Sequence, residues 1–226
     1  MDQRVLQLLQ LTLLLGLLQA CDGSSGTTPT PPQAEIRPYE LGFTPWPYHD
    51  TATAVNFVYS EVSLRGDFIA HHLDAGIPWE EALNGTPYSA ELDAEISARL
   101  GNTPTDKRRY LAVSPLNGKR DGLADYWGTA PNQPLPSPWD TRALNDPDVI
   151  TAYINFATDL IQRFNPDYFS LGIEVSEYLL NDIAAYDTLV DFTAAVSDFL
   201  KAQFPNVQLM VSVALKSPNS SETATI

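Results

Sequence analysis

Short, nearly continuous apolar runs recur along the chain from residue 39 onward. Each is rich in β-branched and aromatic residues, which is typical of strands that are covered on both faces. The runs predict five strands, within residues 39–47, 54–63, 108–118, 167–176 and 206–215.

Between these runs, apolar residues recur at helical spacing, which predicts three helices within residues 87–102, 145–166 and 186–206. We expect Asp146 to cap the start of the second helix, with Pro147 in its first turn. Gly101 is the expected C-terminal cap of the first helix. The alternation of strands and helices predicts an α/β fold with a parallel sheet.

Two α/β architectures fit this alternation. A doubly wound sheet carries a glycine-rich turn after its first strand, whereas this chain has the segment "TPWPYHDT" there. A (β/α)8 TIM barrel instead gathers functional residues at the carboxyl ends of its strands. Polar and aromatic residues follow the predicted strands repeatedly: Trp46, Tyr48, His49, Asp50, Glu61, His71, His72, Asn117, Lys119, Glu174 and Glu177. The pattern therefore favours the barrel.

The first residues have the organisation of a signal peptide, expected to span residues 1–20. Arg4 precedes an apolar run over residues 5–18, which is shorter than the roughly 20 residues of a membrane span. The segment "LQAC" ending at Cys21 resembles the lipobox of bacterial lipoproteins, in which the cysteine is lipidated. The alternative is a buried free cysteine behind an ordinary signal peptide.

Residues 21–38 are small, polar and rich in proline, so we expect a flexible tether between the lipidated cysteine and a domain at 39–226. Such a protein would be anchored through Cys21 to a membrane of the bacterial cell envelope and face the periplasm or the exterior. No pattern in this sequence indicates an oligomeric state.

The composition and charge of the chain limit the classes of molecule that it is expected to bind. The chain has 226 residues, of which 44% are hydrophobic and 18% charged, as expected for a folded domain. Its formal net charge of -15 argues against binding to nucleic acid or, through charge, to anionic lipid. A neutral substrate fits, and we expect no cofactor.

One segment resembles a known enzyme family. Residues 164–175 follow the pattern "F-x-P-D-Y-x-x-L-G-x-E-V", which is similar to the fourth strand of TIM-barrel retaining glycoside hydrolases, of the clan that includes endo-β-1,4-galactanases. The resemblance implies that Glu174 is the general acid/base. The clan usually has asparagine before this glutamate, where it helps to hold the substrate's 2-hydroxyl, and this chain has Ile173.

Cleavage with retention needs a second carboxylate about 5–5.5 Å from the first. In the resembling families this nucleophile ends the seventh strand, whereas five strands are predicted here. We therefore expect the N-terminal part of a longer glycoside hydrolase, inactive alone. Glu177 is an alternative partner, although a pair spaced by three residues has no precedent in the clan.

Other candidates have both a binding and a structural interpretation. His71 and His72 suit hydrogen bonds to substrate hydroxyls better than a metal site, because no third ligand is suitably spaced. The tryptophans suit either stacking on sugar rings or packing, and Trp79 is expected to anchor a short helix. The predicted substrate-binding residues are Trp46, Asp50, Glu61, His71, His72 and Glu177, with no metal site.

Three hypotheses follow. The chain is part of a surface-anchored glycoside hydrolase acting on a poly- or oligosaccharide, a non-catalytic lipid-anchored carbohydrate-binding protein of barrel ancestry, or a non-functional gene fragment. The replacement of asparagine by Ile173 suits the second hypothesis. The sequence contains no pattern that specifies the sugar, the linkage, or endo versus exo cleavage.

Overall fold

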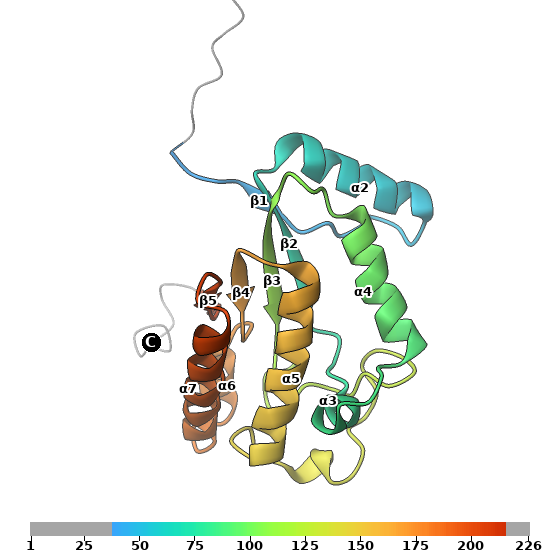
Figure 1. Cartoon of the computed structure of the whole chain (residues 1–226). Coiled ribbons are helices and arrows are strands. Elements are labelled where there is room, and N and C mark those ends of the chain that lie inside the picture. Colours follow the sequence, from blue (N-terminus) through green and yellow to red (C-terminus); the bar gives the residue numbers. More distant parts are fainter. Residues whose placement is uncertain (1–37, 216–226) are drawn as a thin grey trace, which may run out of the picture. The chain divides into compact units, whose positions relative to one another are not determined.

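A sheet of five parallel strands forms the scaffold of the computed structural model, which describes residues 38–215 (Figure 1). The strands are β1 (Gly42–Phe43), β2 (Phe68–Leu73), β3 (Arg108–Val113), β4 (Tyr168–Ser170) and β5 (Gln208–Met210). They lie side by side in chain order. A doubly wound sheet would reverse its strand order at a switch point, so this uninterrupted order is that of part of a (β/α)8 barrel.

Helices separate successive strands and cover the sheet. They are α2 (Ala52–Arg65), α3 (Trp79–Asn84), α4 (Ala90–Asn102), α5 (Pro147–Phe164), α6 (Ser176–Asn181) and α7 (Tyr186–Gln203), with a 3-10 turn η1 at Trp139–Thr141. Within the part of the chain that the structure describes, none of these helices combines the length and apolar character needed to cross a membrane.

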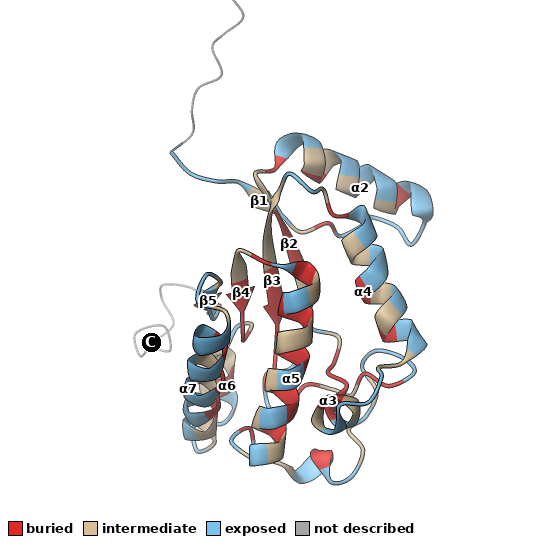
Figure 2. Ribbon diagram, in the orientation of Figure 1, coloured by how far each residue is buried: buried red, intermediate tan, exposed pale blue. Residues whose placement is uncertain are grey.

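The hydrophobic core lies between the sheet and helices α5 and α7 (Figure 2). Leu111 and Phe169 are paired in register on β3 and β4, and both are fully buried. Phe156 and Phe164 of α5 belong to the same buried cluster. Side chains alternate along a strand, so the residues before and after Leu111 in β3, and before and after Phe169 in β4, face the opposite side of the sheet. That side corresponds to the inside of a barrel.

Helix α5 shows how local sequence fixes an element. The Asp146 side chain accepts a hydrogen bond from the Asp148 N–H at 2.9 Å, and Pro147 occupies the first turn, as predicted. The helix ends where Asn165 adopts a left-handed backbone, one residue before Pro166. Its buried residues lie on the stripe that faces the core.

The prediction of a strand within residues 54–63 is wrong, because this segment belongs to helix α2. The Thr51 side chain caps the helix by accepting a hydrogen bond from the Ala54 N–H. The second strand is β2, which was missed because His71 and His72 interrupt its apolar run. The two histidines therefore lie in a strand and not in a loop.

The other predicted elements are confirmed, with different ends. Strands β1, β3, β4 and β5 fall inside predicted ranges but are shorter, and α4, α5 and α7 match the three predicted helices. Gly101 was wrongly expected to cap the first of these helices. It lies inside α4, which ends one residue later, and Thr103 is the cap. Trp79 begins α3 and is fully buried, as expected.

Candidate active site

The carboxyl ends of parallel strands meet at one edge of the sheet, and this edge holds three of the predicted site residues. Trp46 follows β1, His72 lies near the end of β2, and Glu174 follows β4. The rings of Trp46 and His72 contact edge to face, with centroids 5.7 Å apart. Trp46 is 66% exposed, so one side of its indole remains open.

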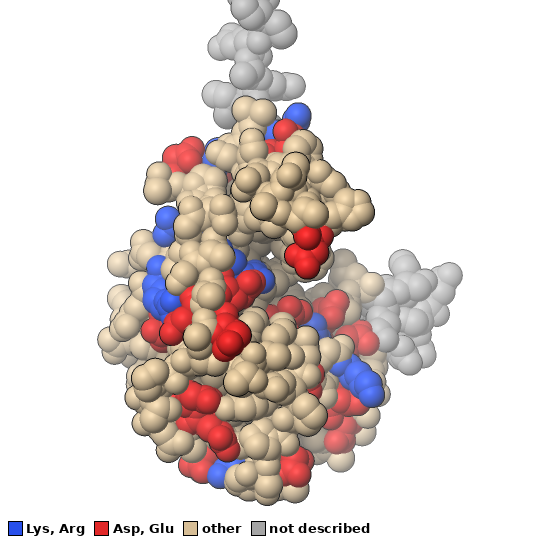
Figure 3. Space-filling model, turned by 90° about the vertical axis from the view of Figure 1, so that its right-hand side faces the viewer, with Lys and Arg blue, Asp and Glu red and all other residues tan. Residues whose placement is uncertain are grey.

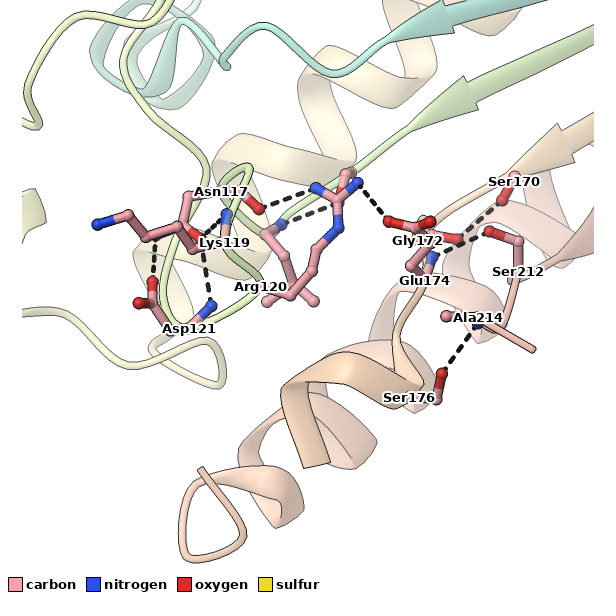
Figure 4. Close-up of polar contacts among 12 residues, drawn as sticks. Asn117, Lys119, Arg120, Asp121, Ser170, Gly172, Glu174, Ser176, Ser212 and Ala214 are labelled. Atoms are coloured by element: carbon pink, nitrogen blue, oxygen red, sulfur yellow. Dashed lines mark hydrogen bonds and ion pairs between the residues drawn. The ribbon is translucent and has the colours of Figure 1, made fainter. Parts of the chain in front are cut away.

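Glu174 lies in a tightly held segment that continues the pairing of β4 with β5. Its backbone N–H donates to Ser212 Oγ at 3.0 Å, and the next N–H, of Val175, donates to the Ser212 carbonyl at 3.0 Å (Figure 4). Ser212 in turn donates its backbone N–H to the Gly172 carbonyl at 3.0 Å. A side chain at position 172 would collide with Val175, because its Cβ would lie 2.6 Å from Cγ1.

The Glu174 side chain is half-exposed and faces Arg120, which lies in the loop after β3 (Figure 4). Arg120 Nη2 donates to Glu174 Oε2 at 3.3 Å, and Nη1 donates to the Asn117 carbonyl at 2.8 Å. Arg120 itself is only 6% exposed. Sequence reasoning missed this arginine, because nothing in its local sequence shows that it is buried against another strand end.

Two neighbours of Arg120 that the sequence singled out shape its loop. Asn117 Oδ1 accepts hydrogen bonds from the N–H groups of Lys119 and Asp121, at 3.1 and 3.2 Å. Asn117 therefore closes a turn of the loop in the way that asparagine side chains commonly do.

A cleft of about 550 Å³ lies beside the loop and is lined in part by Asn117, Asp121 and Tyr178.

The two histidines lie on opposite sides of the sheet. His71 is fully buried and contacts Phe164, with ring centroids 5.3 Å apart, so it faces the helices. Its Nε2–H donates to Thr103 Oγ1 at 2.8 Å, because that hydroxyl donates its own proton to the Arg99 carbonyl. Burial, reinforced by the positive charges of Arg99 and Arg109, lowers the pKa of His71 to about 3. His71 is therefore neutral.

His72 faces the opposite side, where it contacts Trp46 and also Tyr110, with ring centroids 5.8 Å apart in the second pair. Burial lowers the pKa of His72, although the negative charge of Asp74 acts in the other direction. Of the two histidines, His72 is the one that lies at the edge shared with Trp46.

The remaining predicted site residues lie elsewhere. Glu61 is in helix α2 and pairs with Arg65, so it does not end a strand as was expected. Asp50 is exposed just before α2. Glu177 lies in the first turn of α6, where its N–H donates to the Glu174 carbonyl at 2.9 Å. The predicted lipidation site Cys21 lies outside the described residues.

The other three tryptophans are core residues. Trp79 stacks on Trp139 with centroids 5.4 Å apart and donates its Nε1–H to the Ala124 carbonyl at 2.8 Å. Trp127 is 7% exposed.

Within residues 38–215, no group of three or more histidine, cysteine or acidic side chains is arranged to hold a metal ion. Figure 3 shows many acidic side chains over one face, with acidic and basic groups around a hollow.

No protein-family profile and no curated protein matches this chain in sequence. Solved structures do match its fold. A GH5_18 protein from Bifidobacterium longum subsp. infantis aligns with 77% of this chain and 43% of its own, at 13% identity and a TM-score of 0.50.

Two further structures match with lower scores. A variant of the GH5_18 protein from Bifidobacterium longum subsp. longum ATCC 55813, in complex with Manb1-4GlcNAc, has a TM-score of 0.47, 13% identity and coverage of 76% of this chain and 41% of its own. The exo-beta-1,4-mannosidase Op5Man5 from Opitutaceae bacterium strain TAV5 has a TM-score of 0.49, 13% identity and coverage of 77% and 32%. The chain thus spans less than half the length of the solved structures it matches.

The strand order and the match to the first of these structures define the class. The described residues form an α/β fold of the (β/α)8 TIM-barrel type, represented by five of its strands. The likeness to a galactanase clan, in contrast, is supported only by the short motif around Glu174.

Proposed function

We propose that this chain is the part of a glycoside hydrolase that supplies the general acid/base, Glu174, for cleavage of a poly- or oligosaccharide. The observation that carries the proposal is the position of Glu174: it follows β4 at the carboxyl edge of the sheet and points its half-exposed carboxylate toward Arg120. Strand ends at this edge are where TIM-barrel enzymes place their reacting groups.

In this role the Glu174 carboxylic acid protonates the oxygen of the leaving sugar as the glycosidic bond breaks. The carboxylate that remains then takes a proton from the attacking water in the second step. Retention also needs a nucleophilic carboxylate about 5–5.5 Å away. We propose that further strands supply it and that the five described strands do not hydrolyse glycosides by themselves.

Trp46 and His72 form the proposed sugar-binding side of this edge. An exposed indole offers a flat apolar surface to the C–H face of a sugar ring. The His72 ring lies edge to face with the Trp46 ring, and we propose that it bonds a substrate hydroxyl group. Glu177 lies three residues beyond Glu174, in the first turn of α6, and we assign it a substrate-facing role rather than nucleophilic attack.

We further propose that Cys21 carries a lipid and anchors the protein in the bacterial cell envelope, as the lipobox-like segment indicates. Metabolic labelling with a palmitate analogue in bacteria tests this. The wild-type chain should incorporate label and the Cys21→Ala variant should not. If both proteins incorporated label equally, or if neither did, the proposed lipid anchor on Cys21 would be wrong. The assignment of Glu174 would not be affected.

A second candidate function is carbohydrate binding without catalysis. Ile173 favours it, because this apolar residue stands where the resembling clan has an asparagine that holds the substrate's 2-hydroxyl. Such a protein would bind saccharides equally well with Glu174 or with glutamine at this position.

Affinity labelling separates the two functions and does not require turnover. An N-bromoacetyl β-glycosylamine binds as a sugar and presents its bromomethylene carbon to the acid/base. A carboxylate oxygen displaces bromide and forms an ester, which peptide mass spectrometry locates. We would treat the full chain with the β-mannosyl, β-glucosyl and β-galactosyl reagents.

At least one reagent should esterify Glu174, and an excess of the matching free oligosaccharide should protect it. Glu91→Gln, at an exposed position in the first turn of α4, should label normally, whereas Glu174→Gln should not label at position 174. Saccharide binding without labelling of Glu174 would favour the non-catalytic protein. Labelling that the free saccharide does not slow would contradict both functions.

A further inference from the structure

The ion pair between Arg120 and Glu174 joins two residues with an unusual backbone. Among the described residues, four that are not glycine have positive φ: Arg120 (57°), Asn132 (54°), Asn165 (44°) and Glu174 (52°). Asparagine tolerates this left-handed conformation, because its short side chain can bond to the local backbone. Arginine and glutamate lack that compensation, so the two strained residues are the two members of the ion pair.

We propose that Arg120 is a positioning residue, which holds the Glu174 carboxylate toward the saccharide at the carboxyl edge of the sheet. The inference rests on the proposed function of Glu174. Backbone strain persists only where surrounding contacts enforce it, and it is concentrated at functional sites. Here both the strained backbones and the bond between the side chains bring the same two groups together.

The burial of the two partners differs, which assigns their roles. The Arg120 side chain is 8% exposed, whereas the Glu174 side chain is 50% exposed. Arg120 is fixed by its Nη1 bond to the Asn117 carbonyl, and its Nε is buried without a hydrogen-bond partner. A buried arginine with an unsatisfied donor is costly to retain. The rigid guanidinium therefore orients the more exposed carboxylate.

A second link joins the same two segments. Helix α6 begins two residues after Glu174, and its last residue, Asn181, reaches back to the Arg120 loop. Asn181 Nδ2 donates to the carbonyls of Lys119 and Arg120, at 2.8 and 3.1 Å. The loop after β3 and the segment after β4 are thus connected at both ends of α6, so the position of Arg120 is defined relative to Glu174.

The test compares labelling rates of Glu174 by the glycosylamine reagent in full-chain variants. Arg120→Met keeps most of the length of the side chain and removes the charge, and we expect labelling to slow by about 10- to 100-fold because the reacting group is misplaced. Arg120→Lys, or added guanidinium ion with Arg120→Met, should restore part of the rate. Arg163→Met is the matched control: it breaks the ion pair of Arg163, on α5, with Asp93, on α4, and should label normally.

A readout independent of sugar covers the case in which Arg120→Met fails to fold. In the wild-type chain, exchange of the Arg120 Nε proton with solvent, followed by NMR, should be at least about tenfold slower than in Glu174→Gln, since the ion pair holds the guanidinium in place.

Unchanged Nε exchange in Glu174→Gln, or unchanged labelling in folded Arg120→Met, would overturn the positioning role while the proposed function stands. Loss of labelling that neither lysine nor guanidinium restores would also count against it, because a structural defect would then explain the loss. Failure to label the wild-type chain would instead contradict the function of Glu174.

Discussion

Two arginines of similar chemistry occupy opposite ends of the sheet. At the amino end, Arg108 begins β3 and donates through Nη1 to both carboxylate oxygens of Glu40 at 2.7 Å, and through Nε to Asp167 at 3.2 Å. It also lies over the Tyr168 ring, 4.6 Å from the centroid. At the carboxyl end, Arg120 meets one oxygen of Glu174 at 3.3 Å.

We interpret the difference between the two ends as the difference between a structural ion pair and the proposed functional one. The amino-end network joins residues next to β1, β3 and β4, and hydrogen bonds from Arg108 to Glu40 raise the pKa of the arginine. At the carboxyl end the pair is longer, both backbones are strained, and the carboxylate is half-exposed. In barrels the amino end contributes stability and the carboxyl end carries chemistry.

The largest change in stability should come from neither end but from the helix-facing core. Phe164 is fully buried, and Phe164→Ala should lower the free energy of unfolding by about 3–5 kcal/mol. Phe199, 46% exposed on α7, gives the control, and its replacement by alanine should change stability by less than about 0.5 kcal/mol. Urea denaturation measures both. Similar losses would mean that the core is not where the fold places it.

The buried His71 should make stability fall as the pH is lowered. The unfolded chain takes up a proton near pH 6.5, whereas His71 in the folded chain stays neutral until about pH 3. Acidification between these values therefore favours the unfolded state, by about 1.4 kcal/mol per pH unit at most. His71→Gln should lose this part of the dependence when urea denaturation is compared at pH 7.5 and 4.5. If the wild-type chain and His71→Gln lost the same free energy of unfolding between these two pH values, His71 would not be the group responsible.

A smaller loss is expected at the amino end. Asp167 Oδ2 accepts the backbone N–H of Arg109 at 2.8 Å, and Oδ1 accepts from Arg108. Asp167→Ala leaves these donors without an acceptor and should reduce the free energy of unfolding by about 1–3 kcal/mol. Labelling of Glu174 should keep its rate. A slower rate would mean that the two ends are coupled.

The smallest change in stability is expected for Arg120→Met. Methionine fills most of the buried volume, and the Glu174 carboxylate that loses its partner is half-exposed and stays hydrated, so we expect a change within about 1 kcal/mol. Urea denaturation checks this beside the labelling rate. A loss as large as that of Phe164→Ala would make Arg120 a structural residue.

Local signals explain which parts of the fold the sequence predicted. Helix α5 carries its own start in Asp146 and Pro147 and a continuous apolar stripe, so its position was predictable. Residues 54–63 have the same apolar character as a strand, and only the Thr51 cap indicates a helix. Strand β2 was hidden because His71 is buried by tertiary contacts, with Phe164 and Thr103, that a linear pattern does not contain.

Only part of the candidate site is marked in the sequence, for the same reason. The motif around Glu174 marks the end of a strand, and the exposed Trp46 and its neighbour His72 lie at the same edge. Arg120 and Ser212 contact Glu174 from other strand ends, 54 and 38 residues away in sequence. Their roles depend on the register of parallel strands, which no single segment encodes.

The most direct test of this account measures Glu174 labelling by the glycosylamine reagent and urea stability together in Arg120→Met and Asp167→Ala. We predict that Arg120→Met slows labelling by about 10- to 100-fold with stability nearly unchanged, whereas Asp167→Ala lowers stability with labelling unchanged. If labelling and stability fall together in both variants, the carboxyl end is not a separate functional site and the central claim is contradicted.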